Sequence, residues 1–126
     1  MALADRLRAA GLNFQQQGGF LVGMFTLEGN RTQVFFLDPD ADDYMGMQDY
    51  DFVSVVGPAD DASKVKKACE LAGKHKRGGI IIRQNLIMMK FDLPVSLDDR
   101  ALVAHVAGVC KTADDLEHAI FGGDAR

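Results

Sequence analysis

The segment "GIIIRQNLIMMKFDLP", Gly79 to Pro94, is predicted to form two strands joined at Gln84-Asn85, and both strands are apolar at successive positions. Side chains of a strand point alternately to opposite faces, so a hairpin with one face in water alternates apolar and polar residues. Here the runs Ile80–Ile82 and Leu86–Met89 place large apolar side chains on both faces. The two faces of this hairpin must therefore be covered, either by the rest of the chain or by a partner.

The rest of the chain predicts three more strands and three helices. Helices are indicated where apolar residues recur at i, i+3, i+4 and i+7, as they do between Val65 and Ala72. Ser96 and Asp99 have the spacing of a capping box and are expected to start the final helix. The expected elements are a helix over 3–10, strands over 20–27, 34–37 and 50–57, a helix over 60–72, the hairpin over 79–94, and a helix ending near 122. This order, α-β-β-β-α-β-β-α, predicts an α+β fold with five strands.

Composition and charge narrow the class of protein. With 126 residues, 48% of them hydrophobic and 25% charged, the chain suits one globular domain over residues 1–126. The net charge of -4 gives no reason to expect the basic surface that attracts nucleic acids and anionic membranes, so neither is an expected partner. No apolar run approaches the ~20 residues of a bilayer span, and the first residues lack a signal peptide's apolar block. We therefore expect a cytoplasmic protein whose Cys69 and Cys110 are reduced and buried on helical stripes.

An acidic loop over residues 38–49, "DPDADDYMGMQD", is the most suggestive cluster of possible metal ligands. Asp38, Asp40, Asp42 and Asp49 occupy positions 1, 3, 5 and 12 of a calcium-loop register, in which oxygen ligands surround a hard cation. Position 6 is Asp43 instead of the glycine that the sharp turn needs, and position 12 lacks the longer glutamate. A solvated acidic loop between two strands is therefore the better interpretation.

The remaining polar patterns predict neither a catalytic nor a metal site. The basic turn over residues 74–79, "KHKRGG", has cations and glycine N–H groups suited to a phosphate, but it lacks P-loop spacing and a preceding strand. His75, His105 and His118 are scattered and match no zinc-ligand pattern. No nucleophile elbow is present in the sequence. We therefore expect no enzyme activity, no metal and no cofactor.

The stretch from the hairpin to the end of the final helix carries a resemblance. The apolar hairpin ends in Leu93-Pro94, and a capped helix follows that closes on an Ala-Asp-x-Leu pattern, here Ala113, Asp114 and Leu116. In this pattern and in the order of its elements the chain resembles the type III secretion chaperone-like fold, and within it the bacterial YbjN-type proteins. The resemblance implies a twisted antiparallel sheet with helices packed on one side, no cofactor, and a homodimer. Proteins of this fold include chaperones that hold an extended client segment on apolar patches.

The hairpin that is apolar on both faces then has two interpretations. A strongly coiled sheet can wrap a small core and use both faces itself. Alternatively, Ile81, Ile87, Met89 and Phe91, or the opposite row, form a dimer interface or bind a partner segment. Six methionines favour the second interpretation, because flexible thioether side chains adapt to varied partners.

We therefore predict a non-enzymatic, chaperone-like or regulatory protein-interaction module. It is expected to bind an apolar segment of a protein partner and to form a homodimer through apolar sheet or helix surface. Strand pairing at a sheet edge can assist this binding. The alternative is a small-ligand or ion sensor that uses the acidic loop 38–49 or the basic turn 74–79.

Overall fold

The computed structural model of the chain describes residues 3–40, 42–74 and 78–122. Three α-helices and one short 3-10 helix join the strands of a single sheet. In chain order the elements are α1 (Leu3–Ala9), β1 (Phe14–Gln17), β2 (Phe20–Thr26), η1 (Glu28–Asn30), β3 (Thr32–Leu37), β4 (Asp42–Tyr44), β5 (Met47–Pro58), α2 (Ala62–Ala72), β6 (Gly79–Arg83), β7 (Leu86–Pro94) and α3 (Asp99–Phe121). The predicted α+β class is confirmed.

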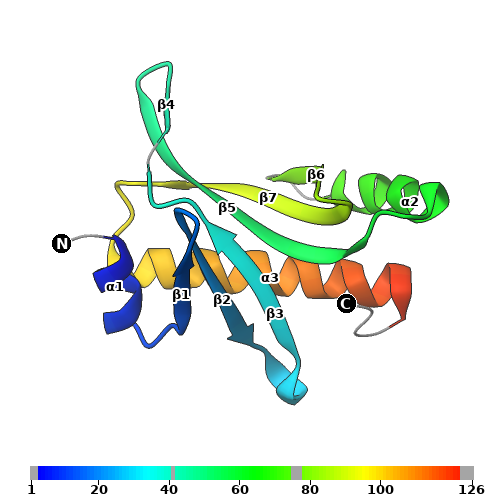
Figure 1. Cartoon of the computed structure of the whole chain (residues 1–126), viewed down its shortest axis with the longest axis horizontal. Helices are drawn as coiled ribbons and strands as arrows, with labels where there is room; N and C mark the ends of the chain where they lie inside the picture. Colours follow the sequence, from blue (N-terminus) through cyan, green and yellow to red (C-terminus); the bar gives the residue numbers. More distant parts are fainter. Residues whose placement is uncertain (1–2, 41, 75–77, 123–126) are drawn as a thin grey trace.

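The sheet is antiparallel throughout the described residues, and six of its strands follow the order β1-β2-β3-β5-β7-β6. A further short strand, β4, pairs with the start of β5 outside this order. Figure 1 shows how strongly the sheet twists, with β2 and β3 running steeply across the direction of β7. The central strand, β5, pairs with β3, β4 and β7 and so connects all parts of the sheet.

The prediction of five strands and of the order α-β-β-β-α-β-β-α is wrong, because β1 and β4 were not anticipated. Strand β1 is "FQQQ", which has no apolar alternation, and it forms through a tight turn at Gly18-Gly19, where both residues have positive φ. Strand β4 lies in the acidic loop and is returned to β5 by a turn at Met45-Gly46, again with positive φ at both residues. Turn geometry of this kind favours hairpins whatever the hydrophobic pattern.

All three α-helices pack on one face of the sheet, which we call the covered face. In Figure 1, α3 crosses behind β2 and β3. One buried cluster joins α1 and the first half of α3 to the sheet around Phe35 and Phe52, whose rings stack at 5.4 Å between centroids. A second cluster joins α2 and the second half of α3 to β7 around Ile87 and Met89. The helices therefore cover one face from end to end, as the resemblance implied.

Local interactions differ from two sequence predictions at the helices. Asp98, and not Ser96, caps α3, because its carboxylate accepts a hydrogen bond from the N–H of Ala101 at 2.8 Å. Cys110 is buried as expected, but Cys69 is exposed, since α2 buries only a narrow stripe of alanines. Within the described part of the chain, no helix has the length and apolar character needed to cross a membrane.

Candidate protein-binding surface

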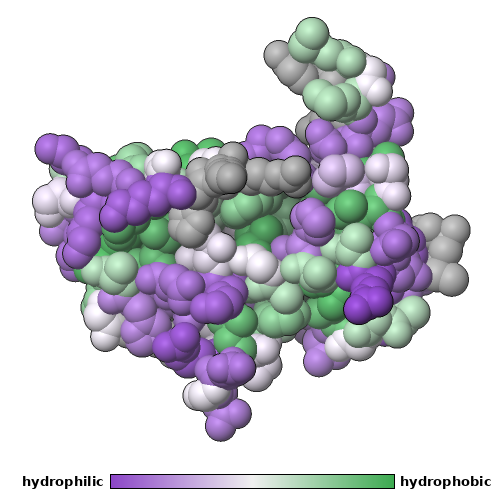
Figure 2. Space-filling model, turned by 180° about the vertical axis from the view of Figure 1, so that it is seen from behind, coloured by the Kyte–Doolittle hydropathy of each residue, from purple (hydrophilic) through white to green (hydrophobic). Residues whose placement is uncertain are grey.

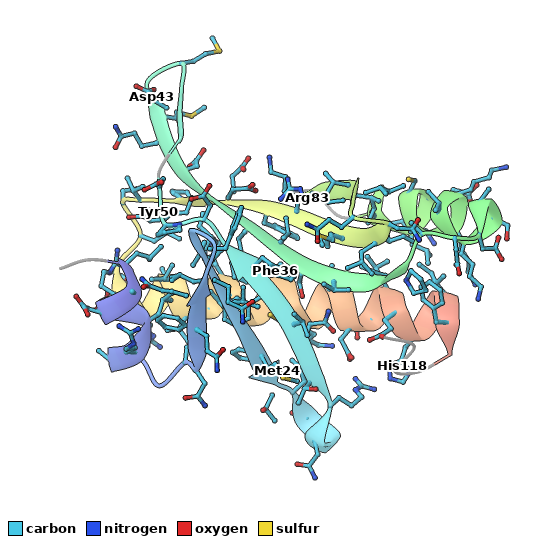
Figure 3. All side chains as sticks on the ribbon, viewed as in Figure 1. Met24, Phe36, Asp43, Tyr50, Arg83 and His118 are labelled. Atoms are coloured by element: carbon cyan, nitrogen blue, oxygen red, sulfur yellow. The ribbon has the colours of Figure 1, made fainter. Side chains whose placement is uncertain are left out.

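The opposite side of the sheet, on which none of the described helices packs, is also apolar, and we call it the outer face. The strand register places Phe36 opposite Val53, and Val55 opposite Met88. Directly opposite residues of an antiparallel pair share a face, so these side chains form a continuous surface. The cluster on this face consists of Val34, Phe36, Val53, Val55, Ile81, Leu86 and Met88. Met24, Phe36 and Arg83, labelled in Figure 3, lie on β2, β3 and β6 and indicate its extent.

The centre of the outer face is buried although no described helix contributes to its cluster. Val53, Val55 and Met88 are only 2%, 4% and 3% exposed. Their neighbours on the adjoining strands, including Phe36 and Ile81, are half-buried. The sheet therefore curls around this face, and the interpretation of a coiled sheet that uses both faces accounts for its centre. Its rim remains accessible to a partner.

Two hollows open on this face. The smaller, of about 110 Å³, is lined by residues from five strands and the turn between β6 and β7: Phe20, Phe36, Val53, Arg83, Gln84 and Met88. The larger, of about 520 Å³, lies towards β1 and is lined in part by Val22, Met24 and Val34. Since Met24 is 54% exposed and Phe20 is 38% exposed, large apolar side chains at the rim are in contact with water. Apolar hollows beside accessible apolar side chains are typical of protein-binding surfaces.

Charged residues border the outer face on β5, β6 and β7. Lys90 Nζ lies 3.8 Å from Asp51 Oδ1 and 3.9 Å from Asp92 Oδ1. Arg83 Nη2 lies 3.9 Å from Asp51 Oδ2. These distances exceed those of hydrogen-bonded ion pairs, so the pairs contribute little to stability and remain free to rearrange.

A hairpin arm, residues 42–49, projects beyond the sheet beside this surface. It is formed by β4 and the first residues of β5, and it stands clear of the rest of the molecule in Figures 1 and 2. Met45 and Met47 at its tip are 84% and 60% exposed. Asp43 stabilises the turn, because its carboxylate accepts a hydrogen bond from the N–H of Gly46 at 3.1 Å. The arm therefore presents flexible apolar side chains on an ordered turn.

The four residues predicted for a partner or dimer surface are not brought together. Ile81 pairs with Met88 and lies on the outer face. Ile87 and Met89 are fully buried under the helices on the covered face, and Phe91 is half-buried there. A partner can therefore reach Ile81 without any rearrangement, whereas Ile87 and Met89 would first have to be uncovered. A role of Ile81 in binding stays a prediction.

The residues that the sequence prediction missed come from β3 and β5. Val34 and Phe36 on β3, and Val53 and Val55 on β5, supply most of the outer-face cluster. The signal was present in the runs "VFFL" and "VSVV", where apolar residues occupy successive positions as they do in the hairpin. The same argument about two apolar faces therefore applies to the middle of the sheet.

The two sites of the alternative sensor function are the acidic loop and the basic turn, and the structure describes more of the first than of the second. The acidic loop 38–49 forms the base and strands of the arm. Among the described residues, no group of three or more histidine, cysteine, aspartate or glutamate side chains is placed to hold a metal ion. In the basic turn 74–79, residues 75–77, and with them His75, lie outside the described residues. His105 bonds to the carbonyl of Ala101, and His118 to Arg31, so these two histidines have structural contacts.

Comparison with known proteins identifies the fold. No family model matches the chain, and no curated protein sequence is significantly similar to it. Among solved structures, a chain of the HopA1-SchA chaperone-effector complex is similar with a TM-score of 0.58 and 14% sequence identity, over 93% of this chain and 91% of that one. At this identity the likeness shows the fold alone. The chain thus has the chaperone-like fold that the sequence predicted, while the more specific likeness to YbjN-type proteins has no support from these comparisons.

Proposed function

We propose that this protein is a non-enzymatic, chaperone-like interaction module, a single cytoplasmic domain that binds an apolar segment of a protein partner on its outer face. The observation that carries the proposal is the apolar cluster around Val53, Val55 and Met88, to which no described helix contributes and whose rim is accessible. The fold is that of a chain in a chaperone-effector complex, which is a second point in favour. Burial of the rim side chains by a partner would supply the binding free energy, at about 25 cal/mol per Å² of apolar area.

The arm supports the same proposal. Met45 and Met47 extend the apolar surface beyond the sheet, and thioether side chains adjust to partners of different shape. A segment that lies on the outer face would have the arm at one end, where the two methionines can fold over it. No rearrangement of the covered face is needed for this mode of binding, because α1, α2 and α3 all lie on the other side of the sheet.

A peptide-binding experiment tests the proposal. The probe is a fluorescein-labelled synthetic peptide of alternating leucine and serine, and its anisotropy is measured against the full chain. Phe36→Asp places a charge at the rim and is expected to weaken binding at least about tenfold, because the peptide would have to desolvate the carboxylate. Ala104→Asp is the matched control, since Ala104 is exposed on α3 and remote from the outer face. Equal affinity of the wild type and Phe36→Asp would contradict the proposal.

Self-association is the second way to cover the outer face, and light scattering over a concentration series measures it. A monomer that binds the peptide supports an open surface for a partner. A dimer that no longer binds the peptide would show that a second copy occupies the face. For the sensor alternative, the expected signature is a rise in thermal stability with calcium or a phosphorylated metabolite and none with peptide.

A further inference from the structure

Carboxylates gather at the end of the outer face that lies nearest the arm. Asp51 on β5 and Asp92 on β7 are directly opposite each other in the strand register. Asp51 is two residues before Val53 and therefore shares its face, because strand side chains alternate. Asp38 follows β3 directly and donates its N–H to the Asp51 carbonyl at 2.9 Å. Acidic side chains from three adjacent strand positions thus border the apolar cluster.

The charges of this acidic end are only partly neutralised. Like charges directly opposite each other destabilise an antiparallel pair. Lys90 and Arg83 approach Asp51 and Asp92 no closer than 3.8 Å. Asp51 Oδ1 is buried and accepts no hydrogen bond from any described residue. A buried acceptor without a donor is costly. Asp92, by contrast, is 63% exposed, so its carboxylate is accessible to a cationic donor supplied by a partner.

The arm adds to the negative potential at the same end. Asp43 and Asp49 lie on it, and Asp40 precedes it, with its N–H bonded to the carboxylate of Asp38 at 3.0 Å. Fields of one sign along a low-dielectric surface steer and orient partners of opposite charge. The apolar cluster and this acidic end are continuous along β5, from Val55 through Val53 to Asp51.

From this arrangement we infer that the partner is a protein segment that is both apolar and basic. The inference rests on the proposed function and names the chemistry of its partner. The apolar side chains of the segment lie on the accessible rim of the apolar cluster, and a lysine or arginine places its charge beside Asp92, whose side chain is exposed. Phe36 on the rim lies opposite Val53, and Asp92 lies opposite Asp51, two residues before Val53. This is about 7 Å along the strand, which is the separation of residues i and i+2 in an extended segment. The basic residue is therefore two positions from an apolar anchor.

Matched peptides test the inference. Three fluorescein-labelled peptides share an alternating leucine-serine core and differ only in two residues at one end, which are arginine, glutamine or glutamate. With the full chain at low salt, the arginine peptide is expected to bind at least about tenfold tighter than the glutamate peptide, with the glutamine peptide between them. The advantage is expected to fall steeply at 0.5 M salt, because the charges are partly exposed.

Variants assign the effect to the acidic end. The double substitution Asp51→Asn and Asp92→Asn conserves shape and is expected to reduce the preference for arginine to about twofold or less. Asp115→Asn is the control, since Asp115 is exposed on α3 and pairs with Lys111 at 3.1 Å, and it is expected to keep the full preference. Equal binding of all three peptides would overturn the charge inference and leave the proposed function intact. Failure of every peptide to bind, or a dimer that excludes them, would overturn both.

Discussion

The covered face and the outer face of the sheet are formed by the same strands but are buried by different means. On the covered face, Phe35 and Phe52 are enclosed by α1 and α3. On the outer face, Phe36 and Val53, each the next residue along the same strands, pack among strand side chains and against no described helix. Neighbouring residues of one strand therefore have different cover.

Met88 and Met89 show why this difference matters. They are adjacent on β7 and are 3% and 0% exposed, so exposure alone does not distinguish them. Met89 lies under the helices, where a partner can reach it only after the core opens. Met88 lies among strand side chains whose outer edges already contact water. Whether a residue is available for binding therefore depends on which elements cover it, helices or strand side chains. Its exposed fraction alone does not decide this.

The largest expected effect comes from placing a charge at these two positions. Met89→Asp is expected to cost more than about 4 kcal/mol of unfolding free energy, because the carboxylate would be buried without a partner. Met88→Asp is expected to cost about 1–2 kcal/mol, since a small movement of the sheet rim brings the carboxylate to water. Urea unfolding followed by circular dichroism measures both. Equal losses would show that the outer face is as closed as the covered face.

A second pair of variants compares the charges on the two faces. Asp114 is fully buried on α3, and its Oδ2 lies 2.7 Å from Nη2 of the partly exposed Arg31. Arg31→Met is expected to cost about 2–3 kcal/mol of unfolding free energy, because the buried Asp114 carboxylate loses its cation. The cost is smaller than for a fully buried pair, since Arg31 is partly exposed. Lys90→Met on the outer face is expected to change stability by no more than about 0.5 kcal/mol, since its ion pairs are long and partly exposed.

The charge comparison has its own control. In the double variant Arg31→Met and Asp114→Leu, both charges are gone, so most of the stability lost in Arg31→Met is expected to return. If the double variant is as unstable as Arg31→Met, the loss reflects packing of the arginine side chain and not its charge. The same urea titrations serve for all of these proteins.

The sequence was a good guide where periodicity is strong. Helix α3 and strands β2, β3, β5, β6 and β7 were predicted at the right places, because long apolar patterns report burial directly. Strand β1, with three consecutive glutamines, and the acidic strand β4 were missed, because their turns and not their patterns create them. Cys69 was expected to be buried, but it is exposed. The spacing of apolar residues predicts the buried side of α2 but not how wide the buried side is.

The sequence predicted that an apolar surface exists on the sheet, but it did not predict which residues form that surface. Two apolar faces could be predicted from the hairpin, and none of the helices that the structure describes packs on one of them. Ile81 was grouped with Ile87 and Met89, although the two-residue turn at Gln84-Asn85 fixes a register that places it opposite Met88. That register was available from the turn, because loop length sets strand pairing in a hairpin. Which face the helices pack on depends on packing across the whole sheet, and this could not be predicted from the sequence.

The two cysteines provide a further test of how completely the covered face is closed to solvent. Burial raises the pKa of the Cys110 thiol to about 12, and a hydrogen bond with the Ser54 side chain lowers it by less. Cys69 is exposed on α2. At neutral pH, iodoacetamide is expected to modify Cys69 at least about a hundredfold faster than Cys110, because the thiolate is the reactive form. Mass spectrometry of Cys69→Ser and Cys110→Ser follows each thiol separately, and comparable rates would mean that the covered face opens readily.

The same pKa predicts a loss of stability in alkali. The thiol holds its proton more tightly in the folded chain than in the unfolded chain, where its pKa is near 9. The stabilisation is therefore complete below pH 9 and is lost as the pH rises from about 9 towards 12. Cys110→Ala removes this contribution, so its unfolding free energy is expected to fall less steeply than that of the wild type over the same range.

The smallest expected effect concerns the end of α2, the helix that covers the β6 side of the sheet. The Asp61 carboxylate accepts hydrogen bonds from the Ser63 hydroxyl at 2.7 Å and from the Ser63 N–H at 2.9 Å. These bonds lower the pKa of Asp61 below its ordinary value of 3.8. A lowered pKa means that the stabilisation is present above pH 3.8 and is lost as the pH falls through the folded-state value.

Asp61→Asn separates the charge from the cap, because asparagine is an equally good N-cap residue. The wild type is expected to be slightly more stable than Asp61→Asn near neutral pH, and the difference is expected to vanish as the pH falls from 3.8 through the lower folded-state pKa of Asp61. Urea unfolding of the two proteins over this range measures it. A difference that persists in acid would show that the hydrogen-bond geometry of the cap, and not the ionised carboxylate, stabilises α2. In either case peptide binding is expected to stay unchanged, because α2 supports the covered face while the proposed binding surface is the outer one.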